Sequence, residues 1–136
     1  MAAFRPATHE PINAFLIDGV YLFKHYFDGD EVFSRLRTYY NNQQYRFEVP
    51  EEDFDTIWSF LADHGYGLVT VDAPEAFVVV VRKYTQHPEN IFKESVMHRS
   101  IPDFNCFLMT SQDAVERATI AGATRLTDTN LDNPFE

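Results

Sequence analysis

The sequence predicts one α+β domain, and three neighbouring segments carry this prediction. Residues 45–49 alternate apolar and charged side chains, the period of a strand with one buried face. Residues 54–61 repeat apolar side chains at helical spacing. Residues 76–81 are apolar at every position, which is typical of a central strand buried on both faces. With a further strand over residues 68–71, the order of this stretch is β-α-β-β.

The segments before this stretch allow more than one interpretation. Residues 1–11 hold two prolines and no periodicity, so we expect a flexible arm. Asp18-Gly19 separates the apolar runs 14–17 and 20–27 and favours a hairpin, with a helix from residue 20 as the alternative. Asp30 can cap a helix over residues 31–40, whereas Asn41-Asn42 would instead allow a hairpin with residues 45–49.

The helix after residue 50 begins with the acidic run 51–53 and ends at Gly65. On it we expect Ile57 and Trp58 to face the valine strand. Residues 72–75 form a turn, and Pro88 begins a helix that reaches His98.

The last third of the chain has clearer signals. Residues 104–109 form a strand, and Thr110-Ser111-Gln112-Asp113 has the spacing of a capping box ahead of a helix that ends at Gly122. Residues 124–126 add a short strand, and residues 128–136 read as a polar tail.

The core order β-α-β-β-α-β fits a ferredoxin-like split β-α-β sheet with both helices on one face. An additional N-terminal helix or hairpin precedes it, and a C-terminal helix follows it. In this arrangement residues 45–49 and 76–81 are antiparallel neighbours. Because such sheets often pair through a face or an edge, we also expect a homodimer.

Composition limits the class of protein. At 136 residues with 45% hydrophobic content, the chain can bury a core of its own, which we place at residues 12–127. Cys106 stands alone, so there is no internal disulfide, and neither a signal peptide nor a membrane-spanning run is found. We therefore expect a cytoplasmic protein without membrane contact.

The charge of the chain is strongly negative, at −10, and only three of its 11 basic residues are lysines. An acid excess with few lysines resembles the composition of haloarchaeal cytosolic proteins, since concentrated salt screens the repulsion between carboxylates. An ordinary acidic protein is the alternative.

Positive charge is concentrated in residues 32–47, which contain no acid, and in residues 82–99. In the split sheet, one end would carry basic and tyrosine side chains together and could bind an anionic ligand or partner. Ion pairing of the arginines with nearby acids is the competing interpretation. The candidate site residues are Arg46, Arg82, Tyr45, Tyr84, Lys83 and Arg99.

A small enzyme is the alternative function. His87 or His98 would then act with Asp103 or Cys106, while Arg82 and Arg99 hold an anion. No metal-ligand spacing and no glycine-rich phosphate loop occur, so we expect neither a metal nor a cofactor.

Nucleic acid is an unlikely partner of this chain. RNA-recognition domains of ferredoxin-like fold stack bases on strand aromatics, and valines 78–81 stand where such an aromatic is needed. The negative charge also opposes binding to a phosphate backbone. A non-catalytic ligand-binding or interaction module is therefore the preferred hypothesis.

Overall fold

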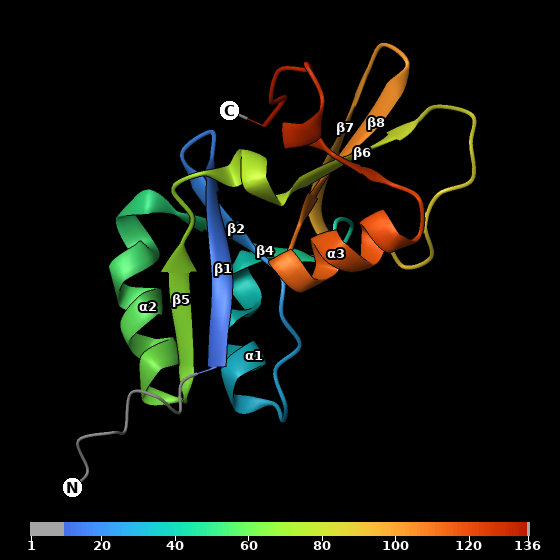
Figure 1. Cartoon of the computed structure of the whole chain (residues 1–136). Helices are drawn as coiled ribbons and strands as arrows, with labels where there is room; N and C mark the ends of the chain where they lie inside the picture. Colours follow the sequence, from blue (N-terminus) through green and yellow to red (C-terminus); the bar gives the residue numbers. More distant parts are fainter. Residues whose placement is uncertain (1–9, 136) are drawn as a thin grey trace, which may run out of the picture. The chain divides into compact units, whose positions relative to one another are not determined.

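A computed structural model describes residues 10–135 and shows a mixed α+β protein built on two separate sheets. The contacts divide the chain into two compact units between Val71 and Asp72 (Figure 1). The expected flexible arm, residues 1–11, lies largely outside the described residues. Its last two residues, Glu10 and Pro11, begin the first strand instead. A single domain over residues 12–127 stays a prediction.

The first unit is a five-stranded sheet in the order β3-β4-β2-β1-β5, with two α-helices. Neighbouring strands are antiparallel except β1 and β5, which are parallel. Its elements are β1 (Glu10–Ile17), β2 (Val20–Phe23), α1 (Glu31–Leu36), η2 (Arg37–Tyr39), β3 (Tyr40–Asn41), β4 (Arg46–Pro50), η3 (Glu51–Asp53), α2 (Phe54–Asp63) and β5 (Tyr66–Thr70).

The Asp18-Gly19 hairpin is confirmed. Ile17 pairs with Val20, and the two residues between them have φ values of 53° and 82°. A two-residue loop with positive φ at both positions matches the right-handed twist of its strands, which is why Asp-Gly favours it.

The two alternatives for residues 31–49 are both partly realised. A helix does begin after Asp30, but it ends at Leu36 and continues only as the 3₁₀ turn η2. Tyr40 then pairs with Phe47, so the competing hairpin forms as well. The β-favouring residues at the end of the predicted helix therefore shorten it by one turn.

Helix α2 packs on this sheet through Ile57 and Leu61, both of which have no exposed surface. The expectation that Trp58 faces the valine strand is wrong. Its side chain is 46% exposed, and its indole Nε1 donates a hydrogen bond to the backbone oxygen of Leu68 on β5 at 3.1 Å. Helical spacing placed the apolar face correctly but could not show which sheet it meets.

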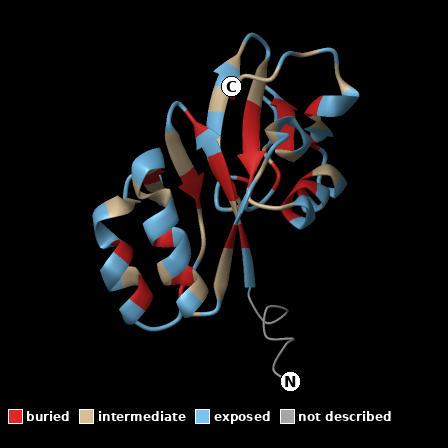
Figure 2. Cartoon of the chain, turned by 90° about the vertical axis from the view of Figure 1, so that its left-hand side faces the viewer, coloured by how far each residue is buried: buried red, intermediate tan, exposed pale blue. Residues whose placement is uncertain are grey.

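The second unit is a four-stranded antiparallel sheet in the order β7-β8-β6-β9, with α3 packed on it. Its valine strand β6 lies between β8 and β9, as predicted, and all four of its valines are buried. Figure 2 colours the buried residues of the chain in red. The elements are η4 (Pro74–Phe77), β6 (Val78–Arg82), β7 (Ser95–Ile101), β8 (Phe104–Met109), α3 (Gln112–Ile120), β9 (Thr124–Arg125) and η5 (Leu126–Asp128).

The helix predicted from Pro88 to His98 is wrong. Residues 88–94 form turns, and β7 pairs with β8 through a tight connection in which Asp103 has a φ of 70°. Pro102 restricts the residue before it to extended conformations, which favours a strand there. The apolar strand β8 supplies the long-range pairing that overrides a weak helical pattern.

The predicted polar tail, residues 128–136, is packed against the rest of the second unit at Pro134 and Phe135, while residue 136 lies outside the described residues. Phe135 has no exposed surface, and Arg99 donates a hydrogen bond to the backbone oxygen of Pro134 and lies over the Phe135 ring. The helix before it was predicted, and the structure identifies its capping residue as Ser111, whose hydroxyl accepts a hydrogen bond from the backbone N–H of Ala114.

The expected ferredoxin-like sheet is not found. Strand β4 pairs with β2 and β3, whereas β6 pairs with β8 and β9, so the two are not neighbours. The basis for a homodimer built on a split sheet is therefore removed. Among the described residues, no helix has the length and apolarity needed to cross a membrane.

Helices α1 and α2 are linked by the histidine that ends α2. The Nδ1 atom of His64 lies 2.9 Å from the backbone oxygen of Phe60, and its Nε2 atom lies 3.2 Å from a carboxylate oxygen of Glu31. Both ring nitrogens thus face acceptors, an arrangement that only the protonated imidazole satisfies. The pKa of His64 is raised, first by the Phe60 carbonyl and then by Glu31.

The core assignment predicts unequal costs for two truncations on α2. Leu61→Ala should lower the free energy of unfolding by about 2–5 kcal/mol because it empties a buried site. Trp58→Phe should cost only about 0.5–1.5 kcal/mol, since it removes one hydrogen bond at a half-exposed site and leaves an aromatic side chain in place. Urea unfolding followed by circular dichroism measures both. A Trp58 change costlier than the Leu61 change would contradict this packing.

Titration of His64 tests the link between the two helices. A pKa raised in the folded state stabilises the protein fully below the ordinary value of 6.5, and this stabilisation is lost as the pH rises through the folded pKa. In an NMR titration, Glu31→Gln should lower the pKa of His64, while Glu52→Gln, on an exposed residue elsewhere, should not. An unchanged pKa in Glu31→Gln would show that the pair is not formed.

Candidate functional site

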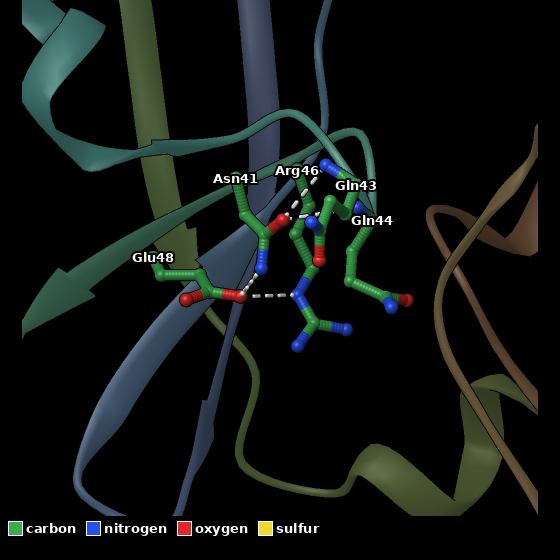
Figure 3. A network of polar contacts seen from close by, with 5 residues as sticks. All are labelled: Asn41, Gln43, Gln44, Arg46 and Glu48. Carbon is green, nitrogen blue, oxygen red and sulfur yellow. Dashed lines mark hydrogen bonds and ion pairs between the residues drawn. The ribbon is translucent and has the colours of Figure 1, made fainter.

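Arg46 is held by its own strand and hairpin (Figure 3). Its Nε atom donates to a carboxylate oxygen of Glu48 at 2.8 Å, and the Asn41 side-chain amide donates to the same oxygen at 3.0 Å. The Asn41 carbonyl in turn accepts backbone N–H bonds from Gln43 and Gln44. Arg46 therefore has a carboxylate partner, as the ion-pair interpretation expects.

A second cation lies close to Arg46. The pKa of Lys24 is lowered, mainly because the side chain is half buried and then because of the positive charge of Arg46. Lys24 follows Phe23, whose register partner is Phe47, so the neighbourhood comes from the pairing of β2 and β4. Two neighbouring cations raise the local positive potential, but the Glu48 carboxylate already neutralises part of it and occupies the Nε atom of Arg46.

The two predicted tyrosines belong to turns. Tyr45 and Tyr84 are highly exposed, and their φ values of 57° and 65° put both in the left-handed region. Tyr45 precedes β4, while Tyr84 follows β6 in the other sheet. The prediction that Tyr45 and Tyr84 lie together at one end of a single sheet is therefore wrong.

Arg82 lies in a different setting from Arg46. It ends β6 opposite Phe104 of β8, and its guanidinium carbon is 5.1 Å from the centre of the Phe104 ring. Within residues 10–135, no carboxylate is within ion-pair distance of Arg82. Arg35, Arg37 and Arg125 likewise have no ion pair within residues 10–135, so the setting of Arg82 is distinguished by the pocket beside it.

A concave site of about 450 Å³ opens beside Arg82, and we call it the Arg82 pocket. Its wall is formed by the end of β6, the segment after it, the start of β8 and the connection from α3 to β9. No aspartate or glutamate lines it among the described residues. The lining residues are Val80, Val81, Arg82, Thr85, Gln86, Pro88, Phe104, Ala121, Gly122 and Thr124.

The polar groups of this pocket are mainly donors. Besides Arg82, the exposed side chains of Gln86 and Thr124 offer an amide N–H₂ and a hydroxyl. The Thr85 hydroxyl already donates to the backbone oxygen of Arg82 at 2.6 Å and so fixes the turn after β6. A positive charge with two neutral donors and no acid suits a carboxylate or a phosphate.

The C-terminal end of α3 also borders the Arg82 pocket, and helix carbonyls there would repel an anion. Those carbonyls are largely occupied, because the N–H groups of Ala121, Gly122 and Ala123 bond to the backbone oxygens of Arg117, Thr119 and Ala118, respectively. The helix end therefore opposes anion binding only weakly.

The remaining basic candidates have other contacts. Arg99 donates a hydrogen bond to the backbone oxygen of Pro134 and lies over the Phe135 ring. Lys83 follows Arg82 in sequence but does not line the pocket. Its backbone N–H donates a hydrogen bond to the backbone oxygen of Asp103 at 2.9 Å. Of the six predicted site residues, Arg82 lines this pocket and the other five do not.

The catalytic alternative is not supported by the sheet. On β8, Phe107 pairs with His98 and the adjacent Cys106 pairs with Arg99, so these two β8 side chains point to opposite faces. The ring centres of His98 and His87 lie 5.8 Å and 5.7 Å, respectively, from the ring centre of Phe107. Both histidines therefore lie on the face away from Cys106.

Cys106 and Asp103 do not complete a catalytic pair either. The Cys106 side chain has no exposed surface, and burial raises the pKa of its thiol, which keeps it protonated and unreactive. Asp103 is exposed at the β7–β8 turn. Within residues 10–135, no group of three or more histidine, cysteine or acidic side chains is placed to hold a metal.

Two pocket residues, Gln86 and Thr124, were missed by the sequence analysis. Isolated polar residues in connections carry no periodicity and match no motif, so only the fold shows that they surround Arg82. The chain matches no protein-family model, and comparison with curated proteins and with solved structures finds no match either.

Proposed function

We propose that this protein is a non-catalytic ligand-binding module whose second unit binds a small anionic ligand at Arg82. The observation that carries the proposal is an arginine with no carboxylate partner within residues 10–135, at a pocket lined by no described acid, in a strongly acidic chain. The missing ion pair alone does not distinguish Arg82, because Arg35, Arg37 and Arg125 also have none within residues 10–135; its position at a pocket lined by no described acid does. The ligand class is a phosphate or a carboxylate, since both accept several hydrogen bonds.

Removal of the Arg82 charge should weaken anion binding without unfolding the protein. Inorganic phosphate and citrate, added at constant ionic strength, separate the two ligand classes by their thermal shifts. Arg82→Gln should weaken binding of the active anion by about 1.5–3 kcal/mol, the range for a hydrogen bond to a charged group. Thr124→Val should weaken it less, because a neutral donor is lost.

Two matched controls make this experiment specific. Lys93→Gln removes an equal charge from the same unit outside the pocket and should bind as the wild type does. Arg46→Gln should lower stability by about 1 kcal/mol through loss of the ion pair with Glu48, which keeps its hydrogen bond from Asn41, and leave binding intact. Equal thermal shifts in wild type and Arg82→Gln, or none in either, would refute the site.

The acidic composition supports a second proposal, that the protein is adapted to concentrated salt in a cytoplasm. Glu51, Glu52, Asp53 and Asp55 lie within five residues at the start of α2, and three of them are exposed. Their repulsion is strong at low salt and is screened at molar salt, where the Debye length is about 3 Å.

The unfolding temperature should therefore rise steeply with KCl, from low to molar concentration. The variant Glu52→Gln, which relieves part of the repulsion, should show a smaller rise than the wild type. Melting curves followed by circular dichroism provide the measurement. A melting temperature that is flat with salt would remove the halophilic interpretation.

A further inference from the structure

A second pocket lies in the first unit and has the opposite chemistry. Its volume is about 300 Å³, at the small end of the range for ligand sites. Aromatic rings form most of its wall, and we call it the aromatic pocket. The residues that line it are His25, Tyr26, Phe27, Gly29, Asp30, Phe33, Tyr40 and Phe47.

The rings of this pocket are set at steep angles around Phe47, which is 1% exposed. The ring centres of Phe27, Phe33 and Tyr40 lie 5.6, 6.0 and 4.9 Å from that of Phe47, at interplanar angles of 60–69°. Rings so arranged present faces in several directions. A ring face is the negative part of an aromatic quadrupole and attracts cations.

One ring of the pocket already contacts a cation. The Arg37 guanidinium carbon lies 5.8 Å from the centre of the Phe33 ring. Arg37 itself does not line the pocket. The face of Phe33 thus shows the type of contact that we expect the pocket to make with a ligand.

The charges around the aromatic pocket also favour a cation. Asp30 is the only charged side chain among the described residues that line it, and no lysine or arginine does so. Its carboxylate makes no capping hydrogen bond to α1 and is therefore available to a ligand. Arg46, next to Phe47 on β4, points to the other face of the sheet because neighbouring strand residues alternate.

His25 does not add a positive charge to this site. Its Nε2 atom lies 3.1 Å from a carboxylate oxygen of Glu10, outside the pocket lining. Burial lowers the pKa of His25 despite the opposing effects of Glu10 and Asp28, so the imidazole is neutral at pH 7 and donates to Glu10. Neutral imidazole completes an aromatic wall without repelling a cation.

We propose that the aromatic pocket binds a small organic cation with a methylated quaternary ammonium group. Such a group spreads its charge over methyls and is weakly hydrated, so aromatic faces can replace its water. A primary ammonium is strongly hydrated, and a metal ion needs several oxygen ligands, whereas one carboxylate lines this pocket. The methylated ammonium therefore fits both the rings and Asp30.

Choline and its uncharged carbon analogue, in which carbon replaces the quaternary nitrogen, are the probes. The two have nearly the same shape, so any difference in affinity reports the charge. NMR titration at constant ionic strength should show choline binding and an affinity for the analogue that is about three- to thirtyfold weaker, the factor for one to two cation–π contacts.

Three variants locate the binding. Phe33→Leu keeps an apolar side chain and loses the quadrupole, and Asp30→Asn loses the charge without loss of a capping bond. Each should weaken choline binding about three- to tenfold. Asp55→Asn, an equal charge change on an exposed residue outside the pocket, should bind choline as the wild type does.

Several outcomes would overturn the proposal. Equal affinity for choline and the carbon analogue would mean a merely apolar pocket, and binding that survives both Phe33→Leu and Asp30→Asn would place the site elsewhere. No choline binding to a protein with native circular dichroism would exclude the site altogether. Arg82→Gln should bind choline normally, which separates this proposal from that for the Arg82 pocket.

Discussion

The burial of four consecutive valines is the constraint on which the second unit depends. A strand apolar on both faces needs a neighbour on each side and cover above and below. Val79 and Val81 pack with α3 through Phe107 and Met109 on one face. On the other face, Arg99 pairs in register with Cys106 and holds the C-terminal segment at Phe135. The end of the chain is therefore structural.

Burial of this strand also places Arg82. The strand ends at Arg82, one residue after its last valine, and β9 pairs only with Val79 and Val80. Beyond that short pairing, the edge of β6 borders the Arg82 pocket, and the Arg82 guanidinium lies over the Phe104 ring. Stacking on an aromatic ring orients a guanidinium while leaving its donors free. A carboxylate partner, as Glu48 is for Arg46, would occupy those donors.

Sequence patterns identified most of the local structure because the signals there are local. The Asp18-Gly19 turn, the apolar face of α2 and the Ser111 cap each depend on residues a few positions apart. Strand partners depend on residues far apart in the chain, and a period-2 pattern does not say which strand lies beside which. For that reason the sequence analysis joined β4 and β6 into one sheet.

The same limit explains what was found of the candidate sites. Arg82 was identified because charge composition is visible in a sequence, but its pairing with Arg46 depended on the wrong sheet. The aromatic pocket was not anticipated at all. Phe33 and Phe47 read as ordinary core residues, and the turns that place Asp30 beside them leave no periodic signal.

The acidity of the chain acts differently on the two pockets. A net charge of −10 creates a negative potential around the molecule, which draws small cations toward any site and opposes the approach of anions. A site for an organic cation then needs only exposed aromatic ring faces and one carboxylate, and the aromatic pocket has both. An anion site needs local positive charge with no acid near it. The absence of acids from the lining of the Arg82 pocket, within the described part of the chain, is therefore as informative as the arginine itself.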